Sequence, residues 1–92
     1  MSEYVTVEAR PTDDPDVLEI LTNQTLTLEG EEVYHNFDEG DQGSPLAQTL
    51  FGVYGINALT IAPQMLTVTR DPEVPWEAIV DEVRDALRDF FL

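Results

Sequence analysis

The sequence contains no cysteine and no lysine, and it has a single histidine and a single tryptophan among 92 residues. Without thiols, the chain cannot form a disulfide, use a cysteine nucleophile, or ligate zinc or an iron–sulfur cluster through cysteine. Without lysine, its basic side chains are four arginines, against 19 aspartates and glutamates. The missing residue types thus exclude thiol chemistry and leave an acidic chain.

The net charge of −15 is the most unusual number in the composition. A surface this negative repels phosphate backbones and anionic lipid surfaces, so we expect neither nucleic acid nor a membrane as a partner. Two explanations of the acidity remain. One is a basic partner; the other is adaptation to high salt, where the Debye length falls to roughly 3 Å at 1 M. The absence of lysine favours high salt.

The length of 92 residues suits a single domain with one two-layer core, and 42% hydrophobic residues are enough to fill it. No charged and then apolar leader precedes Tyr4. The longest weakly polar run, residues 50–62, is too short and too interrupted by glycine to cross a bilayer. We therefore expect one cytoplasmic domain over residues 1–92.

The strongest organisational signal is a capped helix that leads into a hairpin. Ser44 is expected to be the N-cap, and Pro45 the first helical residue, where its missing N–H costs nothing. Leu46, Leu50 and Phe51 then share the side of a short helix that must be buried. This pattern predicts a helix that begins at Pro45 and ends near two glycines that let the chain turn.

Two strands and a second helix are predicted after that helix. Apolar residues and threonines alternate in residues 59–61 and 66–68, and residues 62–64 are short enough to close a hairpin between them. A proline-rich turn then precedes an amphipathic helix that starts at Trp76. Its apolar positions, which recur at three and four residues, are Trp76, Ile79, Val80, Val83, Ala86, Leu87 and Phe90.

The first half of the chain predicts further strands. Residues 4–9 alternate as a strand with one buried face, residues 10–16 form an exposed turn, and residues 17–21 return antiparallel. Residues 25–28 either continue that strand or add a short one. Residues 29–43 are expected to be an acidic loop, with residues 33–37 as a weaker strand candidate.

The order of strands, helix, hairpin and helix predicts an α+β fold. We expect a mainly antiparallel sheet with two helices packed on one face.

Catalysis or metal binding would have to use His35 and the acids of residues 29–41. Nothing in the sequence supplies a nucleophile to such a site, because Ser44 is better explained as a cap. The acidic clusters of residues 38–41 and 13–16 lack the ligand spacing of an EF-hand loop. A small enzyme or metal-binding protein centred on His35 remains an alternative, and we predict no catalytic residue, metal ligand or cofactor.

A family resemblance rests on the central segment. Residues 43–47 read Gly-Ser-Pro-Leu-Ala, Leu50-Phe51 follows them, and residues 66–70 read Leu-Thr-Val-Thr-Arg. With these motifs the chain resembles the N-terminal domain of the Nfu/NifU family of iron–sulfur cluster scaffold proteins. The resemblance continues upstream over residues 15–20 and downstream to Trp76. One departure is an acidic residue, Glu19, where the family usually has lysine.

The resemblance implies a non-catalytic accessory or protein-interaction domain in iron–sulfur cluster assembly. In the family the cluster is carried by a part with a Cys-x-x-Cys motif, so this chain would act in trans with a cluster-carrying scaffold or a recipient apo-protein.

Aromatic side chains that a small domain leaves exposed are common interface anchors, and we predict Tyr54, Trp76 and Phe91 for that role. The alternatives are that Phe51, Trp76 and Phe90 are core residues, or that the aromatic C-terminus forms the contact of a structural or regulatory dimer.

Overall fold

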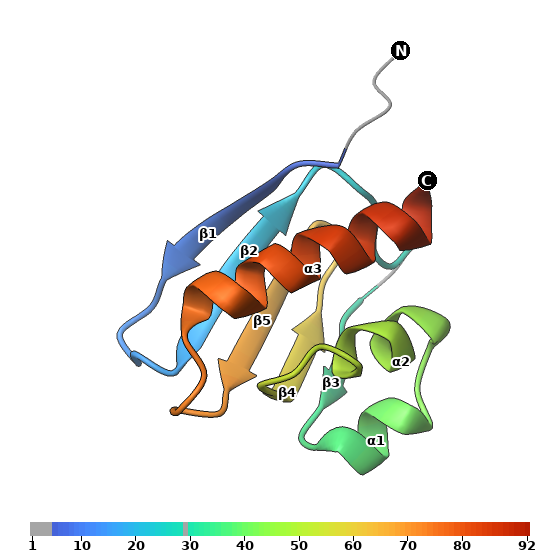
Figure 1. Cartoon of the computed structure of the whole chain (residues 1–92). Helices are drawn as coiled ribbons and strands as arrows, with labels where there is room; N and C mark the ends of the chain where they lie inside the picture. Colours follow the sequence, from blue (N-terminus) through green and yellow to red (C-terminus); the bar gives the residue numbers. More distant parts are fainter. Residues whose placement is uncertain (1–4, 29) are drawn as a thin grey trace.

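The computed structural model describes residues 5–28 and 30–92. In chain order, the elements are β1 (Val7–Pro11), β2 (Val17–Thr22), β3 (Glu32–Tyr34), α1 (Phe37–Asp41), α2 (Pro45–Phe51), β4 (Ile56–Ile61), β5 (Met65–Arg70) and α3 (Trp76–Phe91). The strands form one antiparallel sheet in the order β1-β2-β5-β4-β3 (Figure 1). The α+β prediction is confirmed.

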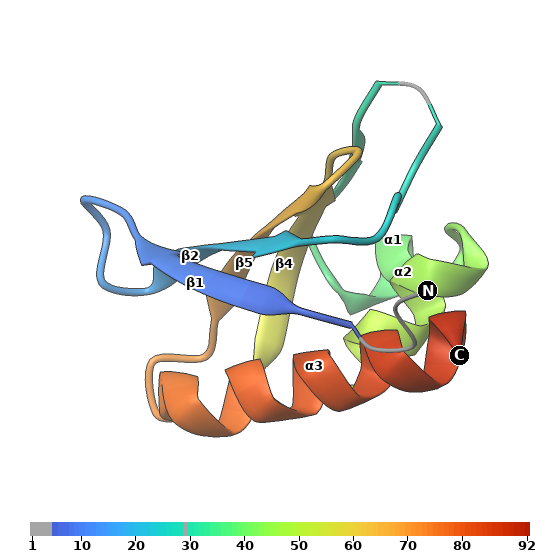
Figure 2. The ribbon, with the colours of Figure 1, turned by 90° about the horizontal axis from the view of Figure 1, so that it is seen from above.

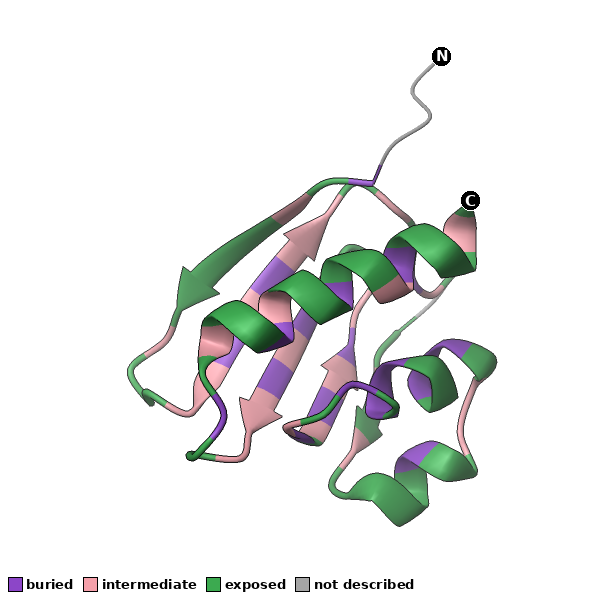
Figure 3. Cartoon of the chain, in the orientation of Figure 1, coloured by how far each residue is buried: buried purple, intermediate pink, exposed green. Residues whose placement is uncertain are grey.

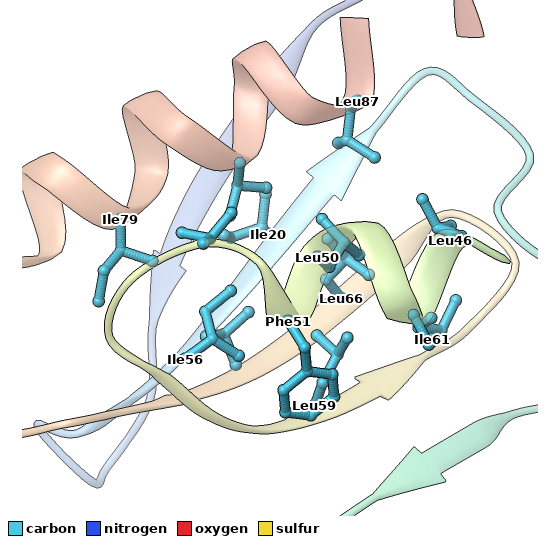
Figure 4. Close-up of a cluster of buried hydrophobic side chains, with 14 of the residues drawn as sticks. Ile20, Leu46, Leu50, Phe51, Ile56, Leu59, Ile61, Leu66, Ile79 and Leu87 are labelled. Atoms are coloured by element: carbon cyan, nitrogen blue, oxygen red, sulfur yellow. The ribbon is translucent and has the colours of Figure 1, made fainter. Parts of the chain in front are cut away.

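Helices α2 and α3 pack on the same face of the sheet, as Figure 2 shows. The strands alternate, so every second side chain points at these helices. The inward strand residues are Leu18, Ile20, Leu59, Ile61, Leu66 and Val68, all buried. They meet the buried faces of α2 and α3 in the core. Figure 3 colours the buried positions purple, and Figure 4 draws a cluster of the buried side chains. Within the described chain, none of the helices has the length and apolar character needed to span a bilayer.

The predicted start of α2 is confirmed. The Ser44 hydroxyl accepts a hydrogen bond from the backbone N–H of Ala47 at 3.3 Å, and Pro45 follows as the first helical residue. The predicted inward residues Leu46, Leu50 and Phe51 are buried. Burial of this face, rather than helix propensity, is what holds so short a helix in place.

Both predicted hairpins are confirmed. In the first, Ala9 of β1 lies opposite Ile20 of β2. Strand β1 continues through Arg10 and Pro11, which were expected in the turn. Tyr4, where the strand was expected to begin, lies outside the described residues. In the second, the backbone N–H of Ala62 donates to the carbonyl of Met65 at 2.8 Å and closes the turn between β4 and β5.

The loop predicted over residues 29–43 is wrong in two places, and the weaker strand candidate at residues 33–37 is confirmed only at its first two residues. Residues 32–34 form β3, because they pair with β4 at the edge of the sheet. Residues 37–41 form α1, whose N-cap Asn36 accepts a hydrogen bond from the backbone N–H of Glu39 at 2.9 Å. Glu29 lies outside the described residues.

The strand considered at residues 25–28 does not form, and the backbone N–H of Leu26 donates instead to the carbonyl of Pro63 at 2.7 Å.

The buried stripe of α3 differs from the prediction at its C-terminal end. Ile79, Val83 and Leu87 are fully buried and lie four residues apart. Continuing at four residues places Phe91 against the core, whereas Phe90 is 42% exposed. The prediction of Phe90 as an inward residue is therefore wrong, because the contact with the sheet follows the spacing of four to the end of the helix.

Candidate functional site: a groove beside Trp76

A groove of about 560 Å³ lies between β1, the turn after it and the first turns of α3. We call it the Trp76 groove; its lining residues are Ala9, Pro11, Thr12, Asp14, Pro15, Val17, Leu18, Trp76, Glu77, Val80 and Asp81. Strand β1 is at the edge of the sheet, and α3 runs over the neighbouring strands (Figures 1 and 2). The inward side chains Ala9 and Pro11 are consequently exposed, and they form one wall of the groove.

The indole of Trp76 is fixed from two sides. Its Nε1–H donates a hydrogen bond to the carbonyl of Pro15 at 2.9 Å, which joins the start of α3 to the β1–β2 turn. The guanidinium carbon of Arg70 lies 5.1 Å from the centre of the ring, within the range of a cation–π interaction. The tryptophan is therefore held in position before any partner arrives.

Arg70 is itself held by three contacts at the end of β5. Its Nε lies 3.1 Å from Oδ1 of Asp16, and its backbone N–H donates to the carbonyl of Asp16 at 2.9 Å. A third bond runs from Nη1 to the carbonyl of Val74 at 3.2 Å. The ion pair is only partly exposed, so solvent screens it less than a surface pair. Arg70 thus links β5, the β1–β2 turn and the segment before α3.

The rim of the groove is acidic, while its floor is largely apolar. Asp14 comes from the turn, and Glu77 and Asp81 come from successive turns of α3. The carboxylate of Asp14 accepts a hydrogen bond from the backbone N–H of Asp16 at 2.9 Å. Oδ1 of Asp81 lies 3.5 Å from Nη1 of Arg84 in an exposed ion pair. The groove can accept apolar groups on its floor and positive charge at its edge.

His35 lies away from this groove. Its side chain is 75% exposed, and Nδ1 lies 3.1 Å from Oε1 of Glu39. The pKa of Glu39 is lowered, chiefly because its carboxylate accepts the backbone N–H of His35 and secondarily because of the imidazole. In residues 5–28 and 30–92, no three histidine or acidic side chains are arranged to hold a metal ion. His35 and its neighbours do not converge in the Trp76 groove.

Ser44 has a structural environment. Its hydroxyl donates to Oε1 of Glu32 at 2.6 Å, and the hydroxyl of Tyr34 donates to the same oxygen at 2.6 Å. The serine therefore caps α2 and ties that helix to β3, as expected for a cap rather than a nucleophile.

Comparison with protein families identifies the family of this chain. The model described as "Scaffold protein Nfu/NifU N terminal" matches residues 7–92. The chain belongs to the Nfu/NifU N-terminal family. The resemblance carried by residues 43–47 and 66–70 is thereby confirmed.

Two curated relatives of this Nfu/NifU N-terminal domain are described as "NFU1 iron-sulfur cluster scaffold homolog, mitochondrial". The one from Drosophila ananassae is 30% identical over 87 residues, and the one from Drosophila persimilis is 29% identical over 87 residues. Each match covers 92% of this chain and 30% of the relative. The chain thus spans under a third of the length of these scaffold homologues.

Solved structures agree with the fold of this Nfu/NifU domain. A NifU-like protein from Saccharomyces cerevisiae is 26% identical, with a TM-score of 0.77 over 96% of this chain and 79% of that one. Protein SAV1430 from Staphylococcus aureus is 13% identical, with a TM-score of 0.70 over 88% of this chain and 96% of that one. At that identity the second match shows the fold alone.

The three predicted anchors do not form one patch. Trp76 lines the groove, whereas Tyr54, 76% exposed in the loop after α2, is not among its lining residues. Phe91 is half-buried against the core and touches the ring of Phe90. Positions 76 and 91 are about 22 Å apart along the axis of α3 at 1.5 Å per residue. Partner contact at each of these residues stays a prediction.

Sequence reasoning missed the groove around Trp76. Two signals were visible: a proline-rich acidic turn at residues 11–16 and an aromatic residue directly after Pro75. The sequence did not show that these two segments are close together, because Pro15 and Trp76 are far apart in the chain and meet only when β2 pairs with β5. The small side chain of Ala9, which leaves the groove open, carried no signal of its own.

Proposed function

We propose that this chain is a non-catalytic accessory domain of iron–sulfur cluster assembly that binds a cluster-carrying scaffold or a recipient apo-protein in trans. Membership of the Nfu/NifU N-terminal family supports a role in iron–sulfur cluster assembly. The 92 residues contribute no cysteine thiolate to a cluster, which supports a binding role rather than a carrying one. The observation that carries the proposal is the Trp76 groove.

The groove supports partner binding because its aromatic wall is preorganised. Tryptophan is enriched among residues that dominate interface energies, and a side chain already ordered loses little entropy on binding. The indole of Trp76 is fixed by Pro15 and Arg70. Of the three predicted anchors, Trp76 is thus the one with a built surface around it.

The alternative functions have weaker support. An enzyme or metal-binding protein centred on His35 would need converging ligands, and the imidazole is instead a solvent-exposed partner of Glu39. A dimer through the C-terminus would use the exposed Phe90 and Leu92, but two copies would bring together chains of charge −15 each.

The test is affinity purification of the tagged chain from native cell extract at the salt concentration of the cell, followed by mass spectrometry. We expect to recover cluster-assembly proteins or iron–sulfur apo-proteins. The affinity of the chain for the purified partner is then measured by direct titration. Trp76→Ala should weaken that affinity at least about ten-fold, because removal of an anchor commonly costs more than 1.4 kcal/mol. Tyr54→Ala and Phe91→Ala test the other two predictions in the same assay.

A matched control is Glu82→Ala, on the exposed part of α3 and outside the groove, which should leave the affinity unchanged. Trp76→Phe keeps an aromatic ring but loses the bond to Pro15, so it separates binding from folding if Trp76→Ala proves unstable. Recovery of no protein of cluster assembly would contradict the proposed function.

A further inference from the structure

We propose that the Trp76 groove binds a cationic segment of a partner protein, with one apolar side chain on the floor and lysine or arginine side chains at the rim. This inference rests on the proposed function, because it names the chemistry of the partner that the same groove would take. It is drawn from the shape, the charge and the rigidity of the groove.

The floor of the groove suits an apolar side chain. Ala9 and Pro11 come from β1, and Val80 and Trp76 face them from α3. None of these four residues is fully buried, so the domain leaves apolar surface uncovered here. A volume of about 560 Å³ exceeds what one side chain fills and lies in the range of ligand sites in proteins.

The rim suits positive charge. Glu77 forms no ion pair with any described residue, and the contact of Asp81 with Arg84 is exposed. Asp14 stands on the opposite side, in the β1–β2 turn. Lysine and arginine can lay their aliphatic stems along an apolar floor while their charged ends reach carboxylates at its edge. The groove therefore favours a segment that mixes basic residues with an apolar one.

A second copy of this chain is a poor occupant. Of its four arginines, Arg70, Arg84 and Arg88 already pair with acids of their own chain. Arg10 alternates with Ala9 along β1 and so points to the other face of the sheet. Each copy also carries a charge of −15, which opposes association. Charge complementarity points to a basic segment of a different protein.

The test uses short synthetic peptides and the purified chain. One peptide carries a single leucine among lysines; a second has serine in place of the leucine; a third has glutamates in place of the lysines. Trp76 is the only tryptophan, so its fluorescence reports on the groove directly. We expect saturable binding of the first peptide, binding about ten-fold weaker for the second, and none for the third.

Charge variants locate the binding. Glu77→Gln with Asp81→Asn should weaken the first peptide about ten-fold. The matched control, Glu82→Gln with Asp89→Asn, removes the same charge from α3 outside the groove and should change the affinity less than about two-fold. Thermal unfolding of both double variants checks that each remains folded.

Three results of the peptide titrations would overturn the inference: no binding of the leucine peptide, equal binding of the serine peptide, or equal weakening by the control variant, which would indicate non-specific attraction. Sedimentation that shows a dimer through this groove would assign it to a second copy.

The two proposals fail separately. If capture of assembly proteins survives Glu77→Gln with Asp81→Asn, the inference that the groove binds a cationic segment is refuted and the proposed function stands. Specific peptide binding without capture of any assembly protein would refute the proposed function and leave the inference that the groove binds a cationic segment.

Discussion

A single glycine in α1 determines how closely that helix approaches the core. Gly40 is buried, and a Cβ added to it would overlap the ring of Phe51. That ring is also contacted edge-on by Tyr34 and Phe37, with centroids 6.2 and 6.3 Å away. The aromatic cluster joins α1, α2 and β3, so it has little freedom to move aside for a new methyl group.

We expect Gly40→Ala to lower the free energy of unfolding by about 1–3 kcal/mol, the usual cost of overpacking a filled site. Equilibrium unfolding in denaturant measures the change. The control is Gly52→Ala. Its φ of −72° is open to alanine, and an added Cβ would lie 3.1 Å from the carbonyl oxygen of Thr49, a much smaller overlap than at Gly40, so the change in unfolding free energy should stay within about 1 kcal/mol. Equal stability of the two variants would show that the Phe51 cluster yields easily.

At the scale of elements, side-chain caps place the short helices. Asn36 caps α1 and Ser44 caps α2, each by accepting a backbone N–H three residues on. Around α1, Glu39 also accepts the backbone N–H of His35, in a variation on the capping box. The Asn-x-x-Glu pattern was present in the sequence, but the surrounding glycines and acids made the segment resemble a loop.

Ser44→Ala removes both the cap of α2 and one hydrogen bond to Glu32. We expect a loss of about 0.5–2 kcal/mol of unfolding free energy, the range measured for N-caps. Thermal and denaturant unfolding followed by circular dichroism would measure it. The matched control is Thr49→Ala, which deletes an exposed hydroxyl bonded to Pro45 in the same helix and should cost less than about 0.5 kcal/mol. An unaffected Ser44→Ala variant would contradict the structural role of the cap.

For the whole molecule, charge is the dominant property. The described residues form three arginine–carboxylate ion pairs: Arg70–Asp16 and two exposed pairs on α3. Since 19 acids face four arginines, most of the carboxylates have no ion-pair partner. Their mutual repulsion opposes the compact state, and salt relieves it.

We expect the melting temperature to rise when NaCl is increased from about 0.01 M to about 1 M, over which the Debye length falls from roughly 30 to 3 Å. Calorimetry at constant pH measures the effect, with an uncharged osmolyte as the control for general solvent exclusion. Full stability at low salt would remove the argument for adaptation to high salt and favour a basic partner as the reason for the acidity.

Features that depend on neighbours a few residues away were predictable from the amino-acid sequence. Alternation predicted the β1–β2 and β4–β5 hairpins, the Ser44-Pro45 pair predicted the start of α2, and the spacing of apolar residues predicted α3. Caps, turns and helix faces are set by residues within about one to two helical turns of each other, so a short stretch of sequence contains the pattern that predicts them.

Other features arise from packing between segments that are distant in the chain. The weak strand signal at residues 33–37 became β3 through its pairing with β4, which placed the strand at residues 32–34. The Trp76 groove forms because the pairing of β2 with β5 brings Pro15 beside Trp76. The same packing turns Phe91 rather than Phe90 toward the core, where it is half-buried, and leaves Ala9 exposed. These outcomes depend on contacts between distant segments, which form only when the sheet and helices pack together.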